Sequence, residues 1–128
     1  MNVADGLLYT KEKEWVKIEG KRATIGISDH AQSLLGDITY IGLPKMGQAL
    51  TQFKQCATVE SVKAASDVYA PLSGTVVELN QQVGPAPEVV NKSPYGDGWF
   101  IRIDIASEKE KANLMTSAQY KTYLEGLA

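Results

Sequence analysis

The stretch ESVKAASDVYAPLSG, residues 60–74, decides the fold of this 128-residue chain. Side chains alternate in character before and after its corner, residues 63–66, and this period of two predicts two strands. The corner contains no glycine, so we expect a turn whose backbone needs no positive φ. Lys63 is therefore expected at the exposed tip of a hairpin, where the small residues that follow it leave its amine accessible.

A second hairpin is predicted near the N-terminus, with strands over residues 7–18 and 21–27, because the side chains of residues 16–19 and 23–27 alternate in the same way. A short helix is predicted over residues 29–35, because Asp29 can cap its start, apolar residues form one face and Gly36 can end it. These elements precede the lysine hairpin and give the chain its first strands.

Two stretches of similar layout flank the lysine hairpin. Residues 38–43 and residues 75–79 each predict a strand that is followed by a glycine-containing turn. We expect two four-stranded halves, related by a pseudo-twofold axis, that close a flattened barrel with the hairpin at one end. Alternation over residues 99–105 predicts a last strand with one strongly apolar face. The predicted fold class is therefore mostly β.

The tail of the chain is predicted to be helical. Ser107 with Glu110, and Thr116 with Gln119, have the spacing of capping boxes. Apolar residues at helical spacing follow, and we expect them to pack on the core: Tyr120, Tyr123, Leu124 and Leu127.

Length and charge narrow the classes of function. The chain fits one domain, residues 1–128, and its 13 Lys and Arg residues against 15 Asp and Glu residues give a net charge of -2. That balance lacks the basic surface typical of proteins that bind nucleic acid or anionic membranes. No apolar run is long enough to span a bilayer, and the start lacks the basic region of a secretory signal or transit peptide. We expect a cytoplasmic protein, or a mature protein of the mitochondrial matrix.

Further motifs accompany the lysine segment. They are YTK at 9–11 with EWV at 14–16, GISDHAQ at 26–32 with LGD at 35–37, LP at 43–44 with Gly47, and VN at 90–91 with SPYG at 93–96 and GW at 98–99. In this order and spacing the motifs resemble the H protein of the glycine cleavage system, and the resemblance covers most of the chain. It implies a barrel-sandwich hybrid fold with an N-terminal hairpin and a C-terminal helical tail.

The resemblance also implies a function. Lys63 would carry lipoate in amide linkage, and the chain would be a non-catalytic carrier, expected to be a monomer. The arm would accept an aminomethyl group from a PLP-dependent glycine decarboxylase and pass it to a tetrahydrofolate-dependent aminomethyltransferase. Dihydrolipoyl dehydrogenase, an FAD enzyme, would reoxidise it, and a lipoate-attaching enzyme would install it.

The same resemblance implies roles for four further residues. Glu60 and the bend at Gly74 would be read by the lipoate-attaching enzyme. Glu14 and Asp67 would be surface carboxylates that line a resting cleft and pair with the cationic end of the loaded arm.

Three alternatives stay open. A carrier that donates its lipoyl group to other lipoyl domains during lipoate assembly would share every motif. An enzyme built on Cys56 or His30 is disfavoured, because no activated nucleophile or acidic partner accompanies them and these single residues cannot form a zinc cluster. Biotin carriage is disfavoured because biotin sites have methionine on both sides of the lysine, where this chain has Val62 and Ala64.

Overall fold

The structure is a computed structural model that describes residues 2–127. Its strands are β1 (Leu8–Tyr9), β2 (Glu14–Glu19), β3 (Arg22–Ile27), β4 (Ile38–Gly42), β5 (Ala49–Leu50), β6 (Gln55–Ser61), β7 (Ala65–Tyr69), β8 (Gly74–Leu79), β9 (Ile101–Ile105) and β10 (Met115–Thr116). Its helices are α1 (Asp29–Leu35), α2 (Val89–Lys92), the 3-10 helix η1 (Glu108–Asn113) and α3 (Ser117–Glu125).

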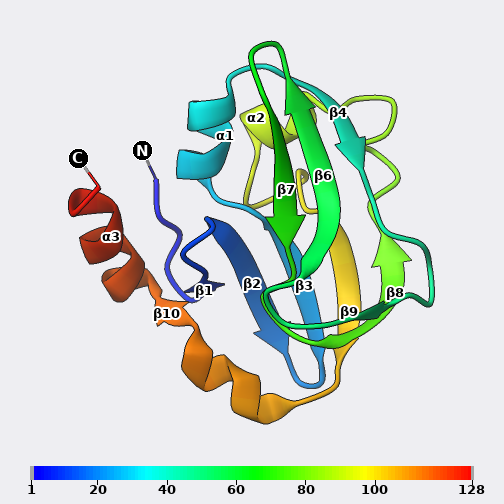
Figure 1. Ribbon diagram of the computed structural model, residues 1–128, viewed down its shortest axis with the longest axis vertical. Helices are drawn as coiled ribbons and strands as arrows, with labels where there is room; N and C mark the ends of the chain where they lie inside the picture. Colours follow the sequence, from blue (N-terminus) through cyan, green and yellow to red (C-terminus); the bar gives the residue numbers. More distant parts are fainter. Residues whose placement is uncertain (1, 128) are drawn as a thin grey trace.

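The strands form two sheets (Figure 1). One has seven strands in the order β10-β1-β2-β3-β9-β8-β5, and the other has three in the order β4-β6-β7. The prediction of a mostly β fold is confirmed, whereas the prediction of two four-stranded halves in a closed barrel is wrong. The partition is unequal because β8 pairs with β9 and β5 rather than with the lysine hairpin. The β6–β7 hairpin therefore lies with β4 in the smaller sheet.

The predicted N-terminal hairpin is present as β2 and β3, but residues 7–18 do not form one strand. The chain turns back between β1 and β2, where the Lys13 amide donates to the Thr10 carbonyl over 3.1 Å. Lys13 has a φ of 75°, a left-handed conformation that is uncommon for a residue with a side chain. The sequence prediction missed this reversal because the alternation on which it rested covers only residues 16–19 in this half of the hairpin.

Helix α1 spans residues 29–35, as predicted, but its N-cap is one residue earlier than expected. Ser28 is its N-cap, and its Oγ accepts from the Ala31 amide over 3.2 Å; the prediction that Asp29 caps the helix is wrong. Gly36 ends the helix with a φ of 78°, as predicted, because glycine reaches this conformation without steric cost.

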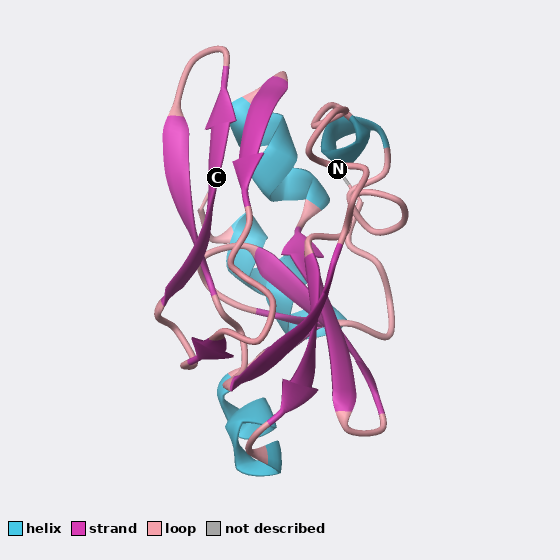
Figure 2. Ribbon diagram, turned by 90° about the vertical axis from the view of Figure 1, so that its right-hand side faces the viewer, coloured by secondary structure: helices cyan, strands magenta, loops and turns pink. Residues whose placement is uncertain are grey.

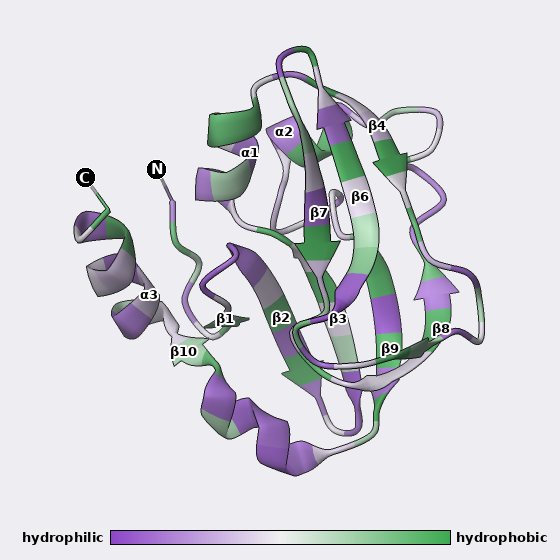
Figure 3. Cartoon of the chain, viewed as in Figure 1, coloured by the Kyte–Doolittle hydropathy of each residue, from purple (hydrophilic) through white to green (hydrophobic). Residues whose placement is uncertain are grey.

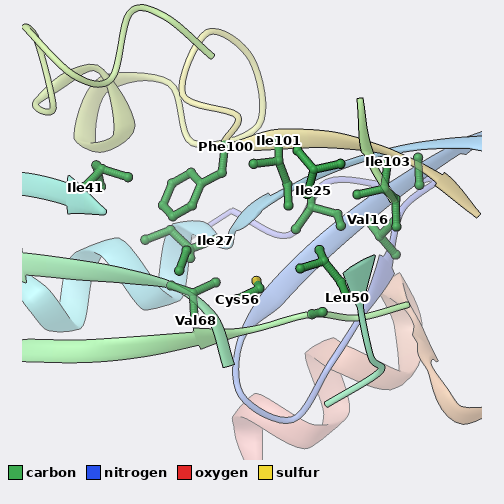
Figure 4. Close-up of a cluster of buried hydrophobic side chains, with 14 of the residues drawn as sticks. Val16, Ile25, Ile27, Ile41, Leu50, Cys56, Val68, Phe100, Ile101 and Ile103 are labelled. Atoms are coloured by element: carbon green, nitrogen blue, oxygen red, sulfur yellow. The ribbon is translucent and has the colours of Figure 1, made fainter. Parts of the chain in front are cut away.

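A hydrophobic core lies between the two sheets, and the apolar side chains labelled in Figure 4 point into it. Hydrophobic residues occur along the strands of both sheets (Figure 3). The seven-stranded sheet contributes Val16, Ile25 and Ile103, and the lysine hairpin contributes Cys56 and Val68. Burial of each large aliphatic side chain contributes about 1.5–3 kcal/mol. The hairpin therefore stands on a packed base, while its turn protrudes at one end of the molecule (Figures 1 and 2).

A second cluster holds the tail against the N-terminal strands. Tyr9 and Tyr120 are fully buried and stack with their ring centroids 4.3 Å apart, next to buried Trp15. The capping box of Thr116 and Gln119 is present at the start of α3, as predicted. The apolar face predicted for the C-terminal helix packs on the protein only in part, because Tyr120 is buried but Leu127 is 51% exposed.

The other predicted capping box is absent. Ser107 precedes η1 but makes no side-chain capping bond. Glu110 is used elsewhere, because its carboxylate accepts from the Ser73 amide over 2.7 Å and from the Ser73 hydroxyl over 2.8 Å. The Glu110 carboxylate, which the local spacing predicted to cap η1, thus binds Ser73 instead.

Within residues 2–127, none of the helices has the length and apolar composition needed to cross a membrane.

Candidate functional site

Lys63 lies in the turn between β6 and β7 and is exposed, as are its neighbours Val62 and Ala64. Strand pairing ends at Ser61 and resumes at Ala65, so the corner comprises residues 62–64 rather than 63–66. The Ser61 amide donates to the Ala64 carbonyl over 2.8 Å, and Ser61 Oγ accepts from the Ala64 amide over 3.2 Å. The turn has no residue with positive φ, which confirms the prediction from its composition.

The turn rests on the segment that joins α1 to β4. The Val62 amide donates to the Asp37 carbonyl over 3.0 Å, and Ser61 pairs with Ile38. The aliphatic stem of Lys63 passes over Gly36, where a Cβ atom would lie 3.4 Å from the Lys63 Cε. The Lys63 side chain therefore lies over Gly36 as far as its Nζ, which is 4.0 Å from the same position.

Two exposed carboxylates lie along the outer face of the hairpin. Glu60 is paired with Ala65, and Asp67 is paired with Thr58. These four residues and Ser66 line a shallow hollow of about 290 Å³. Asp67 lies about 7 Å along β7 from Ala65, at the rise of a β-strand. Both carboxylates are thus on the part of the hairpin that carries Lys63.

Glu14 has a different environment, since its side chain is only 1% exposed. Thr10 Oγ1 donates to Glu14 Oε1, and the Tyr69 amide donates to Glu14 Oε2 over 3.1 Å. Burial raises the pKa of Glu14 from 4.5 to about 7, although the hydrogen bonds from Thr10 and Tyr69 act to lower it. The prediction that Glu14 is a surface carboxylate is wrong, because the reversal between β1 and β2 brings Thr10 over it.

A cavity of about 370 Å³ lies next to this buried carboxylate. Its lining comprises Tyr9, Thr10, Lys11, Glu12, Phe53, Tyr69, Asn113 and Met115. Both groups that donate hydrogen bonds to Glu14, the Thr10 hydroxyl and the Tyr69 amide, belong to lining residues. Glu14 therefore lies directly behind the cavity wall, at the base of the strand that begins beside Lys63. Sequence reasoning missed Thr10 and Tyr69, although both fall within the quoted motifs.

Gly74 is buried at the start of β8, in the seven-stranded sheet, and pairs with Leu50 and Ile105. A Cβ atom at this position would lie 2.3 Å from the Asp104 carbonyl oxygen. The structure thus places Gly74 where two strand backbones approach closely, and not beside the lysine turn.

Cys56 and His30 lie in separate environments. Cys56 is in the core between the sheets, and burial, with a further contribution from Glu14, raises the pKa of its thiol to about 12. His30 lies on α1 beside another hollow, which is also lined by Lys13 and Lys121, and its pKa is lowered by burial and by Lys13. Cys56 is therefore a buried thiol of the core, with little thiolate at neutral pH.

The comparisons with known proteins agree with this arrangement. A family model described as Glycine cleavage H-protein matches residues 7–126. The chain belongs to this family. It is 46% identical to the glycine cleavage system H protein of Halothermothrix orenii, over 98% of each chain. It is also 46% identical to the protein named glycine cleavage system H protein 2, mitochondrial, of Arabidopsis thaliana, over 96% of this chain and 79% of that protein.

A solved structure of the family has the same fold. The crystal structure of a glycine cleavage system H protein from Mycobacterium marinum superimposes with a TM-score of 0.86, at 30% sequence identity, and covers 96% of this chain and 99% of that one. The expected H-protein fold class is therefore confirmed, with the two sheets arranged as described above.

Proposed function

We propose that this chain is the lipoyl-carrying shuttle of a glycine cleavage system. It takes an aminomethyl group from a PLP-dependent glycine decarboxylase to a tetrahydrofolate-dependent aminomethyltransferase, and dihydrolipoyl dehydrogenase reoxidises it. The observation that carries the proposal is Lys63 on an exposed turn at the tip of a hairpin, in a member of the H-protein family. The chain acts as a monomeric, non-catalytic carrier, in the cytoplasm or in the mitochondrial matrix.

The residues around Lys63 fit a lipoyl attachment site. Lys63 is exposed, Ala64 and Ala65 are small, and the lysine stem passes over Gly36, which has no side chain to cover it. Lipoate in amide linkage would supply a disulfide that can be reduced and reoxidised. The chain cannot supply this chemistry itself, because its one cysteine is buried Cys56, whose thiol has a pKa of about 12.

We assign recognition by the lipoate-attaching enzyme to two positions. Glu60 is exposed on β6 within three residues of Lys63, so an enzyme that reaches the lysine also meets this carboxylate. Gly74 contributes from a distance, because it permits the close approach of β8 to β9 and thereby sets the path of the chain that follows the hairpin.

We assign to Asp67 and Glu14 the role of stabilising the cationic end of the loaded arm, Asp67 on the hairpin and Glu14 behind the cavity. A lipoyl-lysine arm reaches on the order of 14 Å, which spans the distance to Asp67 and approaches the cavity beside Tyr69. Asp67 offers an exposed carboxylate, whereas Glu14 is buried and partly protonated near neutral pH. A cation in the cavity would favour the ionised form of Glu14, because opposite charges attract strongly where water is excluded.

The attachment site is tested by producing the chain with lipoate and a lipoate-attaching enzyme, followed by intact-mass measurement and peptide mapping. One lipoyl group is expected, on Lys63, and none in the Lys63→Arg variant. Lys92→Arg is the matched control and should be modified like the wild type. Modification of Lys54 or Lys92 with Lys63 left bare would overturn the assignment.

The cleft is tested by loading the lipoylated chain with the aminomethyl group and measuring ammonia release without tetrahydrofolate or partner enzymes. Glu14→Gln and Asp67→Asn, made singly, should release ammonia roughly ten- to a hundredfold faster at most. Asp67→Asn loses a charged hydrogen bond worth about 1.5–3 kcal/mol, and Glu14→Gln loses the negative charge behind the cavity wall. Equal release in all three proteins would show that these carboxylates do not shelter the cargo.

A further inference from the structure

The Asn91 side chain braces the segment on which the lysine turn rests. Its Nδ2 donates to the Gly36 carbonyl and to Gln32 Oε1, each over 2.9 Å, and its Oδ1 accepts from the Ile38 amide, also over 2.9 Å. Both Nδ2 hydrogens are used, so the amide plane is fixed. One side chain thus holds the peptide groups on both sides of Asp37.

Asp37 is the residue that contacts the turn. Its carbonyl accepts from the Val62 amide over 3.0 Å, and the preceding residue, Gly36, lies under the stem of Lys63. The direction of the Asp37 carbonyl depends on the peptide planes that Asn91 holds. A rotation of this segment would therefore move both the anchor of Val62 and the surface below the lysine.

The brace has a rigid base. Asn91 lies on α2, where the neighbouring Val90 is fully buried in the core. Gly98 packs so closely on this helix that a Cβ atom there would lie 2.8 Å from the Val90 Cα and 2.7 Å from the Ser93 carbonyl oxygen. The position of Asn91 is thus set by backbone packing, independently of the lysine hairpin.

We infer that Asn91 is a positioning residue for the attachment of lipoate to Lys63. Within residues 2–127 its side-chain hydrogen bonds go to Gln32, Gly36 and Ile38 and not to Lys63, and it acts by holding the 36–38 segment so that the turn is presented in one conformation. This inference rests on the proposed function, because it assumes that Lys63 is the residue modified. When the turn is mobile, only a fraction of the chains presents the correct conformation, and the apparent affinity of the enzyme falls by that fraction.

The chain offers a matched control in Asn80. Its Nδ2 also donates two hydrogen bonds, to the Asp97 and Trp99 carbonyls, and its Oδ1 also accepts one, from the Gln82 amide. Asn80 is 4% exposed and has no hydrogen bond to the 36–38 segment or to the hairpin among residues 2–127. Asn91→Asp and Asn80→Asp therefore make the same chemical change, and general loss of stability should be no smaller in the control.

Two measurements are made on each folded protein: lipoate attachment with the attaching enzyme, and amide hydrogen exchange at Val62. For Asn91→Asp we expect kcat/KM of attachment to fall about tenfold, mainly through a higher KM. The part-buried hydrogen bonds from Nδ2 to Gly36 and Gln32 are replaced there by repulsion between oxygen atoms. Exchange at Val62 should rise by a similar factor, about tenfold. Asn80→Asp should match the wild type in both measurements. If Asn91→Asp does not fold, Asn91→Ala replaces it, since Asn91 is half-buried and water can enter its place.

If Asn91→Asp and Asn80→Asp lower kcat/KM of attachment equally, the inference is overturned, because general destabilisation then explains the loss. Wild-type attachment, or unchanged Val62 exchange, in the folded Asn91 variant would overturn it as well. Failure of the proposed function is a separate result, since the wild-type chain would then remain unmodified at Lys63 whatever the exchange rate of Val62.

Discussion

Replacing Glu14 by glutamine should change how the stability of the protein depends on pH. Glu14 is 1% exposed, and burial raises its pKa from 4.5 to about 7. A carboxyl group with a raised pKa in the folded state binds its proton more tightly there than in the unfolded chain. Its contribution to stability is therefore fully present below pH 4.5 and is lost as the pH rises through about 7.

The size of the effect follows from the two pKa values. The interval from 4.5 to about 7 corresponds to a loss on the order of 3 kcal/mol, because each pKa unit is worth about 1.4 kcal/mol. The amide of the Glu14→Gln variant does not titrate. Its oxygen can accept from the Tyr69 amide, and its nitrogen can donate to Thr10 Oγ1, so the local packing is kept.

The assay is urea unfolding of wild type and Glu14→Gln from pH 4.5 to pH 8, with the free energy of unfolding extrapolated to water. The stability of the variant relative to wild type should rise by on the order of 3 kcal/mol across this range, whatever its value at the acid end. Asp67→Asn, unfolded over the same pH range, is the control for loss of a carboxylate at an exposed position. Parallel profiles for wild type and Glu14→Gln would refute the reasoning and show that Thr10 and Tyr69 keep Glu14 ionised.

Three further predictions concern the hairpin, the sheet and the tail. Glu60→Ala should slow lipoate attachment by about tenfold with an unchanged circular dichroism spectrum, since it removes one charged contact of the enzyme; an unchanged rate would place recognition elsewhere. Gly74→Ala should lower the free energy of unfolding in urea by roughly 3 kcal/mol, because its Cβ would lie 2.3 Å from the Asp104 carbonyl oxygen and backbone atoms cannot move easily. A variant as stable as wild type would contradict this close approach. Thr116→Ala should cost about 1 kcal/mol through loss of the capping box, and Ser107→Ala, which lacks a capping bond, should cost less.

The lysine hairpin could be predicted from sequence because its determinants are local. Alternation specified β6 and β7, and the small, glycine-free corner specified a turn without positive φ. The capping box at Thr116 was predictable for the same reason, since the two bonds join residues three positions apart. At Ser107 the same spacing failed, because Glu110 contacts Ser73 across the fold and a local pattern holds no information on that partner.

The burial of Glu14 shows where local reasoning ends. A lone charged residue in an alternating strand is ordinarily expected on the solvent side, since an unpaired buried charge is costly. Here the left-handed turn at Lys13 folds Thr10 back onto Glu14, and β7 brings the Tyr69 amide from 55 positions away in the sequence.

Asn91 depends on the fold in the same way, because its three partners lie 53 to 59 positions away. Nothing near Asn91 in the sequence indicates that it holds the segment under the lysine. The residue proposed to carry lipoate can thus be found from its neighbours in the chain, whereas the residues around it come together only when the two sheets pack. Mutations at Glu14 and Asn91 should therefore alter function while the lysine motif itself remains intact.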